Sequence, residues 1–395
     1  MCISAKSTTE AKPAMPFYAS ELTSVLSDRL SSWHGARLKF MARYIGSLLK
    51  LVTTNGKELA LALNPRVKNG SNYRRIQRFM SEFAFDFEAF GRFLFSLLPQ
   101  KEGFLVVMDR TEWHFGSEPV NVLMIGFAYK GIAFPVLWKV LATGEENGSG
   151  GKEGASSTAE RKELFERFLE LVPPEKIRAF VADREFISEE WLGFLTEREV
   201  PFVIRIRSSR KVALSESGEA ALAARMFFRK PLLRAEGQKR RPAGAEHFVG
   251  GQPVTVTGKR LVKEEDELLI VISSGLCSCE KPLQLYRRRW EIESLFAAMK
   301  SRGFNLETTH VTTPERIAKL VGLLALAFVW SHLVGQERHQ KEPLKTKNHG
   351  WPERSLFRYG LDLLRSIMLN LAEKKEQFLR CVQLLRGRPS KSFVV

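Results

Sequence analysis

The sequence predicts a mixed α/β sheet with helices on its faces, set between a helical N-terminal region and a helical C-terminal region. Residues 104–108 form a continuous apolar run, as expected of a strand buried on both faces. Residues 120–141 have the pattern of two strands joined by a tight turn at Lys130-Gly131. Between residues 159 and 206, helical and strand patterns alternate, which is typical of a sheet covered by helices.

The N-terminal region, residues 17–98, has apolar residues at intervals of three and four, which predicts helices. Residues 1–16 are expected to form a flexible tail. The interval 59–81 contains no acidic residue. Three of its arginines lie within about one helical turn: Arg74, Arg75 and Arg78. This pattern indicates either a helix that contacts DNA or a solvated basic face.

The core elements follow one another in a fixed order. The predicted strands are 104–108, 120–129, 132–141, 177–182 and 201–206, and the predicted helices are 159–171 and 188–199. A loop rich in Gly, Ser and Glu is expected at 143–158. The alternation predicts that the first and fourth strands end at Asp109 and Asp183.

Residues 207–279 break this alternation and are interpreted as a β-rich insertion. From residue 205 to residue 241 there are eleven basic and three acidic residues, so the insertion is expected to face phosphates; the alternative is a basic surface without function. After it, residues 280–335 return to a helical pattern that belongs to the core. Residues 336–395 are expected to form a helical C-terminal region, a candidate for dimerisation.

The overall charge favours a polyanionic partner. The chain has 395 residues, with 61 Lys and Arg against 44 Asp and Glu, so the formal net charge is +17. Four scattered cysteines do not suit a disulfide framework, which favours a cytoplasmic location. The polar N-terminus does not resemble a signal peptide. The most apolar stretch, residues 321–334, is shorter than the roughly 18 residues of a membrane span and predicts a buried helix, with no membrane partner.

A third acidic residue joins the two aspartates in the segment 286–300. On a helix that advances about 100° per residue, four polar side chains fall within roughly 60° of one another: Tyr286, Arg289, Glu293 and Lys300. The apolar residues of the segment occupy a separate arc that can pack on the core. The alternative is a solvated face on which Arg289 and Glu293 form an ordinary i,i+4 pair.

Three carboxylates on separate elements are typical ligands of divalent cations. Two Mg²⁺ ions about 3.5–4 Å apart, with Mn²⁺ as a substitute, can activate the attacking oxygen and stabilise the leaving oxygen when a phosphodiester is displaced. The neighbouring cations would neutralise phosphates without reading base sequence. Asp109, Asp183 and Glu293 are therefore the predicted metal ligands and catalytic residues.

The spacing Tyr286-x2-Arg289-x3-Glu293-x6-Lys300 is similar to the YREK signature of bacterial insertion-sequence transposases of the insertion-sequence-four family. Residues 108–113 resemble that family's first aspartate motif, and residues 182–186 resemble its second. The three carboxylates have the family's order and lie 74 and 110 residues apart. The similarity extends from about residue 30 to residue 335.

The resemblance implies a ribonuclease-H-like catalytic core at residues 99–206 and 280–335, interrupted by the insertion. It implies a DDE transposase whose metal ligands are the three carboxylates and whose Tyr286, Arg289 and Lys300 contact DNA near the cut. The enzyme would act as a synaptic homodimer on terminal inverted repeats, by cut-and-paste transposition into double-stranded target DNA in the bacterial cytoplasm. The alternatives are a metal-dependent DNA nuclease without strand transfer and a catalytically inactive DNA-binding derivative.

Several neighbours of these motifs have open assignments. Glu112 and His114 are candidate extra ligands, or else residues on the far side of the strand and on the surface. Arg184 could brace a carboxylate or meet a phosphate. Some relatives stack a flipped base on a tryptophan of the insertion, but no tryptophan occurs between residues 191 and 290. A DNA-hairpin route would need another aromatic platform among Phe227, Phe228 and Phe248.

Overall fold

The computed structural model of the chain describes residues 15–115, 118–141, 156–218, 220–228, 247–260, 268–274, 281–348, 350 and 352–387. Most of the expected tail, the expected loop as far as residue 155, and the centre of the basic insertion lie outside the described residues.

Five helices precede the sheet, and polar side chains fix where several of them begin. Asn55 accepts hydrogen bonds from the backbone amides of Lys57 and Glu58, and Asp86 accepts one from Ala89 at 2.8 Å. These contacts satisfy amides that have no partner within the helix. The helices are α1 (Phe17–Arg29), α2 (Gly35–Leu51), α3 (Gly56–Leu63), α4 (Asn69–Glu82) and α5 (Phe87–Ser96).

One ten-stranded sheet forms the centre of the molecule, in the order β3-β2-β1-β4-β5-β10-β9-β8-β6-β7. The β1–β4–β5 part is parallel, and the strands on both sides of it are antiparallel. The strands are β1 (Phe104–Phe115), β2 (Glu118–Tyr129), β3 (Ile132–Leu141), β4 (Ile177–Ala182), β5 (Phe202–Ile206), β6 (Lys211–Ala213), β7 (Ala221–Ala223), β8 (His247–Val249), β9 (Gln252–Arg260) and β10 (Leu268–Ser274). The mixed α/β sheet expected from the sequence is confirmed.

The extent of the first strand differs from the expectation. Strand β1 does not end at Asp109 but continues to Phe115, because its pairing with β2 extends six residues beyond that point. The described strands of the expected β-rich insertion extend the core sheet through the antiparallel pair β5–β10, in which Ile206 faces Ile270.

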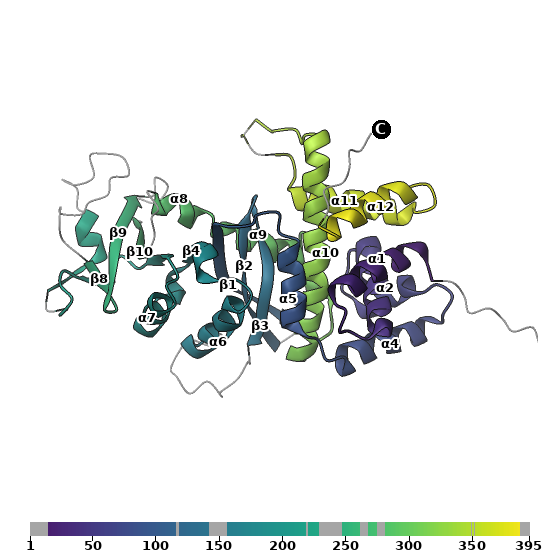
Figure 1. Cartoon of the computed structure of the whole chain (residues 1–395), viewed down its shortest axis with the longest axis horizontal. Coiled ribbons are helices and arrows are strands. Elements are labelled where there is room, and N and C mark those ends of the chain that lie inside the picture. The colour runs from purple at the N-terminus through teal and green to yellow at the C-terminus, as the bar shows by residue number, and fades with distance from the viewer. Residues whose placement is uncertain are drawn as a thin grey trace, which may run out of the picture.

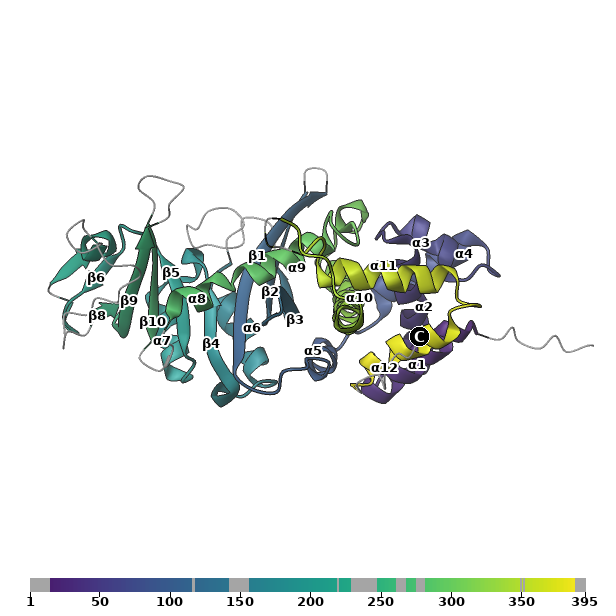
Figure 2. The ribbon, with the colours of Figure 1, turned by 90° about the horizontal axis from the view of Figure 1, so that it is seen from above.

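The helices around the sheet are set by local contacts. Ser157 and Glu160 form a reciprocal capping box at the start of α6 (Thr158–Leu169), as the sequence S-x-x-E favours. Helix α7 (Glu189–Glu197) follows β4. Two short helices, α8 (Pro282–Arg287) and α9 (Trp290–Met299), then run one after the other along the sheet (Figure 2).

Helix α10 (Pro314–Lys341) lies between the sheet and the helices α1, α2 and α4 (Figure 1). By length and composition it is the one described helix that could cross a membrane, but its apolar window is entirely buried inside the protein, so this is weak evidence for a span. Residues 321–334 thus form the buried helix that was predicted. The domain boundary expected at residue 335 falls inside α10.

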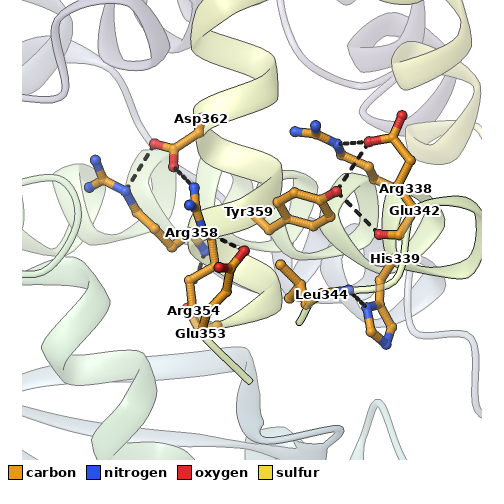
Figure 3. Close-up of polar contacts among 10 residues, drawn as sticks. Arg338, His339, Glu342, Leu344, Glu353, Arg354, Arg358, Tyr359 and Asp362 are labelled. Atoms are coloured by element: carbon orange, nitrogen blue, oxygen red, sulfur yellow. Dashed lines mark hydrogen bonds and ion pairs between the residues drawn. The ribbon is translucent and has the colours of Figure 1, made fainter. Parts of the chain in front are cut away.

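The last two helices, α11 (Leu356–Leu369) and α12 (Lys375–Leu385), pack against α10 and against α1 and α2. A network of polar contacts joins α10, α11 and the chain that connects them (Figure 3). Arg338 lies 4.0 Å from the ring of Tyr359 and donates to Glu342, and Asp362 accepts from both Arg354 and Arg358. The two ends of the chain therefore contribute to one helical unit.

Candidate active site

The parallel pairing of β1 with β4 places the two aspartates side by side. Val107 lies opposite Val181 in the register, so Asp109 and Asp183, two residues further on, are level with each other. Asp183 directly follows β4, whereas Asp109 lies where β1 leaves β4 and continues with β2 alone. The opening between diverging strands at the carboxyl end of a parallel sheet is a common place for a site.

Arg289 joins Asp109 to Glu293. Its Nη1 donates to Oδ2 of Asp109 at 2.9 Å, and its Nη2 donates to Oε1 of Glu293 at 2.6 Å. The exposed fraction of the Arg289 side chain is 7%, against 15% for Asp109 and 37% for Glu293. A buried guanidinium in such a position is stabilised by both carboxylates, which offset the cost of removing it from water.

Tyr286 completes the connection to the second aspartate. Its hydroxyl donates to Oδ1 of Asp183 at 3.0 Å, and the backbone amide of Arg184 donates to the same oxygen at 2.7 Å. Burial, together with the negative charge of Asp183, raises the pKa of Tyr286 to about 12. The phenol therefore remains a hydrogen-bond donor at physiological pH.

The site holds an excess of negative charge around Asp109. Burial raises the pKa of the Asp109 carboxyl to about 6, although the Arg110 amide and the Arg289 guanidinium stabilise its charged form. The carboxylates of Glu185 and Glu293 raise this pKa further. A buried carboxylate with two acidic neighbours is a place where a bound cation would relieve repulsion.

The segment 286–300 is not the single regular helix that was expected. The chain makes tight turns at Arg288 and Arg289 between α8 and α9, and Lys300 caps the end of α9. Glu293 lies in the first turn of α9, where the helix dipole favours a carboxylate. Lys300 donates to the backbone carbonyl of Glu112 at 2.5 Å.

The three carboxylates are thus gathered around Arg289 and Tyr286 rather than in direct contact with one another. Among the residues that the structure describes, no three His, Cys, Asp or Glu side chains lie close enough together to hold a metal ion. The donor set nevertheless fits Mg²⁺ or Mn²⁺, which take carboxylate oxygens as ligands. Binding a cation at Asp109 and Glu293 requires Arg289 to release them.

The neighbours of the first aspartate motif lie on the other face of β1. Glu112 contacts Arg110 at 3.1 Å and His114 at 3.2 Å, and all three alternate with Asp109 along the strand. His114 is exposed. The positions of Glu112 and His114 therefore agree with the interpretation that they are surface residues and not additional metal ligands. In the second motif, the side chain of Arg184 is exposed, and its backbone amide donates to Asp183.

Two groups of candidate DNA contacts have opposite exposure. Arg74, Arg75 and Arg78 on α4 are all exposed. Phe228 and Phe248 are 8% exposed, so neither is an open stacking platform. Phe227 is half-buried and packs edge-to-face against His247.

Trp290 was missed by the reading of the sequence. It is 60% exposed at the start of α9, beside Arg289, whose Cζ lies 5.3 Å from the indole. Its place within the Tyr286–Glu293 segment was the available signal, but the apolar character of tryptophan predicts burial. An exposed tryptophan beside a cationic side chain presents an aromatic face on which a base could stack.

Residues 155–330 match the family model for the transposase DDE domain. The match covers less than half of the chain. It includes Asp183, Tyr286, Arg289, Glu293 and Lys300, and it begins after Asp109. No curated protein matches the chain. The match supports a DDE transposase, a class of enzymes that cut and transfer DNA.

Proposed function

We propose that the chain is a DDE transposase that cuts and transfers DNA with Asp109, Asp183 and Glu293. The observation that carries the proposal is the joining of these three carboxylates through Arg289 and Tyr286 at the edge where β1 and β4 diverge. Two of the three lie inside the segment that matches the transposase DDE domain. The sheet order around them supports a ribonuclease-H-like core of the kind found in the insertion-sequence-four family.

Asp109, Asp183 and Glu293 would hold two Mg²⁺ ions, for which Mn²⁺ could substitute. When bound, these ions activate the attacking oxygen and stabilise the leaving oxygen of an in-line phosphodiester displacement. The chain contributes the buried position of Asp109, which strengthens its attraction for cations. It also contributes Tyr286, whose hydroxyl fixes the orientation of Asp183.

Arg289 has two roles in this proposal. In the structure it neutralises Asp109 and Glu293. When cations and DNA enter, its fork of donors becomes available for a phosphate near the cut, a geometry that Arg matches in a bidentate manner. Lys300 would contact a second phosphate as a point charge, after leaving the Glu112 carbonyl.

The substrate would be double-stranded DNA that carries the terminal inverted repeats of an insertion sequence, bound by a homodimer during cut-and-paste transposition in the bacterial cytoplasm. Two exposed arginines of α4, Arg75 and Arg78, and the net charge of +17 support contact with the duplex outside the cut site. A strand-transfer assay with a free 3′-OH end separates this function from that of a nuclease. A chain that binds ends but cuts none would be an inactive derivative.

The first prediction tests the roles of two residues in the signature. Glu293→Gln removes an anionic oxygen ligand, so single-turnover cleavage in Mg²⁺ should fall by several orders of magnitude while DNA binding is kept or strengthened. Lys300→Ala removes one phosphate contact. It should reduce the steepness of the plot of log K against log salt concentration by about one unit. Cleavage should be partly recovered at high protein concentration.

Both variants are measured by binding titrations at several salt concentrations and by cleavage of a duplex from the flank of the reading frame. A near-normal cleavage rate for Glu293→Gln would remove the basis for the catalytic assignment. In that case the α8–α9 segment would be only a basic surface facing DNA.

A further inference from the structure

An open groove of about 930 Å³ lies between α2 and α4. Five of its lining residues are Lys or Arg: Arg37, Lys39, Arg43, Arg75 and Arg78. No carboxylate is among the described residues that line it. Such a concentration of one sign of charge points to an anionic ligand.

Within the described part of the chain, none of the five Lys and Arg residues of the groove forms an ion pair with a carboxylate. Arg37 instead contacts an aromatic ring, with its Cζ 5.8 Å from the ring centroid of Phe83. These like charges repel one another, and a polyanion would relieve the repulsion.

The floor of the groove holds the two helices in fixed relative positions. Phe40 of α2 and Phe79 of α4 stack with ring centroids 4.6 Å apart and planes 24° apart. Asn72 is fully buried and donates to the carbonyls of Ala60 and Asn64, both at 2.9 Å, which ties α4 to the end of α3. The cations are therefore presented from a preorganised surface, which lowers the entropy lost on binding.

The spacing of the cations fits a phosphodiester chain better than a single phosphate. Arg37 and Arg43 are six residues apart on α2, which is about 9 Å at about 1.5 Å per residue. That length spans two to three phosphates at about 3.4 Å per strand along a DNA duplex. Arg75 and Arg78, about one turn apart, extend the row of charges across the groove onto α4.

We propose that this groove binds the sugar-phosphate backbone of duplex DNA without reading base sequence. The inference rests on the proposed function, since it assigns a second contact with the same substrate. Helices α2 and α4, which line the groove, lie on the opposite side of α10 from β1 and β4, which position the two aspartates (Figure 1). The groove would therefore hold a duplex away from the point where it is cut. Arg75 and Arg78 belong to this phosphate site, whereas Arg74, which does not line the groove, does not.

The test uses the full chain in EDTA and a fluorescent 30-base-pair duplex of unrelated sequence, titrated at four KCl concentrations. The variants are Arg37→Ala/Arg43→Ala on α2 and Arg75→Ala/Arg78→Ala on α4. Each pair should lower the slope of log K against log salt by about two units and weaken binding about 10- to 100-fold near 0.1 M salt. Arg74→Ala is the matched control, with the same charge and helix, and should leave the slope unchanged.

Arg75→Lys/Arg78→Lys keeps the charge and should keep the slope, which separates lost charge from disturbed folding. Wild-type slopes for both alanine pairs would overturn the proposal, as would an equal loss for Arg74→Ala. The proposal would also be overturned if an alanine pair changed the molecular mass of the protein in solution relative to the wild type but left DNA binding unchanged. That result would assign the groove to a protein partner. The titration does not depend on cleavage. If the groove binds DNA but the chain cuts none, the proposed function is refuted and the proposal for the groove is kept.

Discussion

The side chain of Arg289 has different partners in the folded chain from the one that its motif implies. The spacing of the signature places it beside Glu293, and the resemblance assigns it to DNA. In the folded chain it is buried and divided between Asp109 and Glu293. A guanidinium has two parallel donors that can serve two carboxylates at once, which a lysine ammonium cannot do with the same geometry.

His332 provides a prediction at the same scale. It is fully buried in α10, and neither ring nitrogen has a hydrogen-bond partner in the described structure. Burial, with a contribution from the charge of Lys130, lowers the pKa of His332 to about 3. The imidazole is therefore neutral when folded but becomes charged in the unfolded chain below pH about 6.5, so the free energy of unfolding falls as pH drops from about 6.5 towards 3.

The His332→Leu variant lacks this proton uptake. Between pH 7 and pH 5 the wild-type chain should lose about 2 kcal/mol more stability than the variant. Urea denaturation at the two pH values measures the difference. His310→Gln, at an exposed histidine, is the control and should behave as the wild type does. Equal losses for the wild type and His332→Leu would show that His332 is not neutral in the folded state.

At the scale of elements, the contact between α10 and α11 depends on two glycines. A Cβ atom on Gly335 would lie 1.8 Å from the carbonyl oxygen of Leu356, and one on Gly360 would lie 1.9 Å from that of Ser331. Both obstacles are backbone atoms, which cannot rotate away. The polar network of Figure 3 also joins these two helices. Its ion pairs are partly exposed, so each contributes little to the free energy of unfolding.

Gly360→Ala is therefore expected to force the two helices apart. Overpacking usually costs about 1–3 kcal/mol, and backbone obstruction places this site at the upper end, so thermal or urea denaturation should show a loss of about 3 kcal/mol. Gly70→Ala in α4 is the matched control. Nothing lies within 4 Å of its added Cβ, and it should gain about 0.4–1 kcal/mol. Unchanged stability for Gly360→Ala would mean that the helices can separate freely.

At the scale of the whole molecule, α10 connects the sheet to both ends of the chain. Trp138 of β3 donates to the carbonyl of Ala318 at 2.9 Å, Lys319 donates to Met80 at 2.8 Å, and Trp330 donates to Cys381 at 2.8 Å. Each bond joins α10 to a different part of the chain. The N-terminal helices are thus part of the same core as the C-terminal helices.

Deletion of residues 1–98 should therefore give a chain that does not fold, because it uncovers the apolar surface of α10 and leaves buried Lys319 without its acceptor. Solubility and circular dichroism measure the outcome. As a control, a protease site placed at the exposed connection of residues 100–102 should give two fragments that stay together during size-exclusion chromatography. A soluble, folded deletion product would show that the N-terminal helices are an independent domain.

Local patterns of the sequence determined a large part of the fold and of the site. Apolar runs and turn residues predicted β3 and β4 with their observed bounds, because local periodicity reflects which face of a strand or helix is buried. The order of Asp109, Asp183 and Glu293 also followed from the sequence. Asp109 and Asp183 follow the predicted apolar runs of β1 and β4, whereas the single helix expected around Glu293 is divided into α8 and α9.

Only the tertiary structure decided how these side chains are used. Arg289 contacts Asp109, which lies 180 residues away along the chain, and Arg288, in the turn between α8 and α9, donates to the carbonyl of Ala128, which lies 160 residues away. The same holds for the cationic groove and for the union of the two chain ends around α10. Periodicity records which face of an element is apolar, but it carries no information about which other element covers that face.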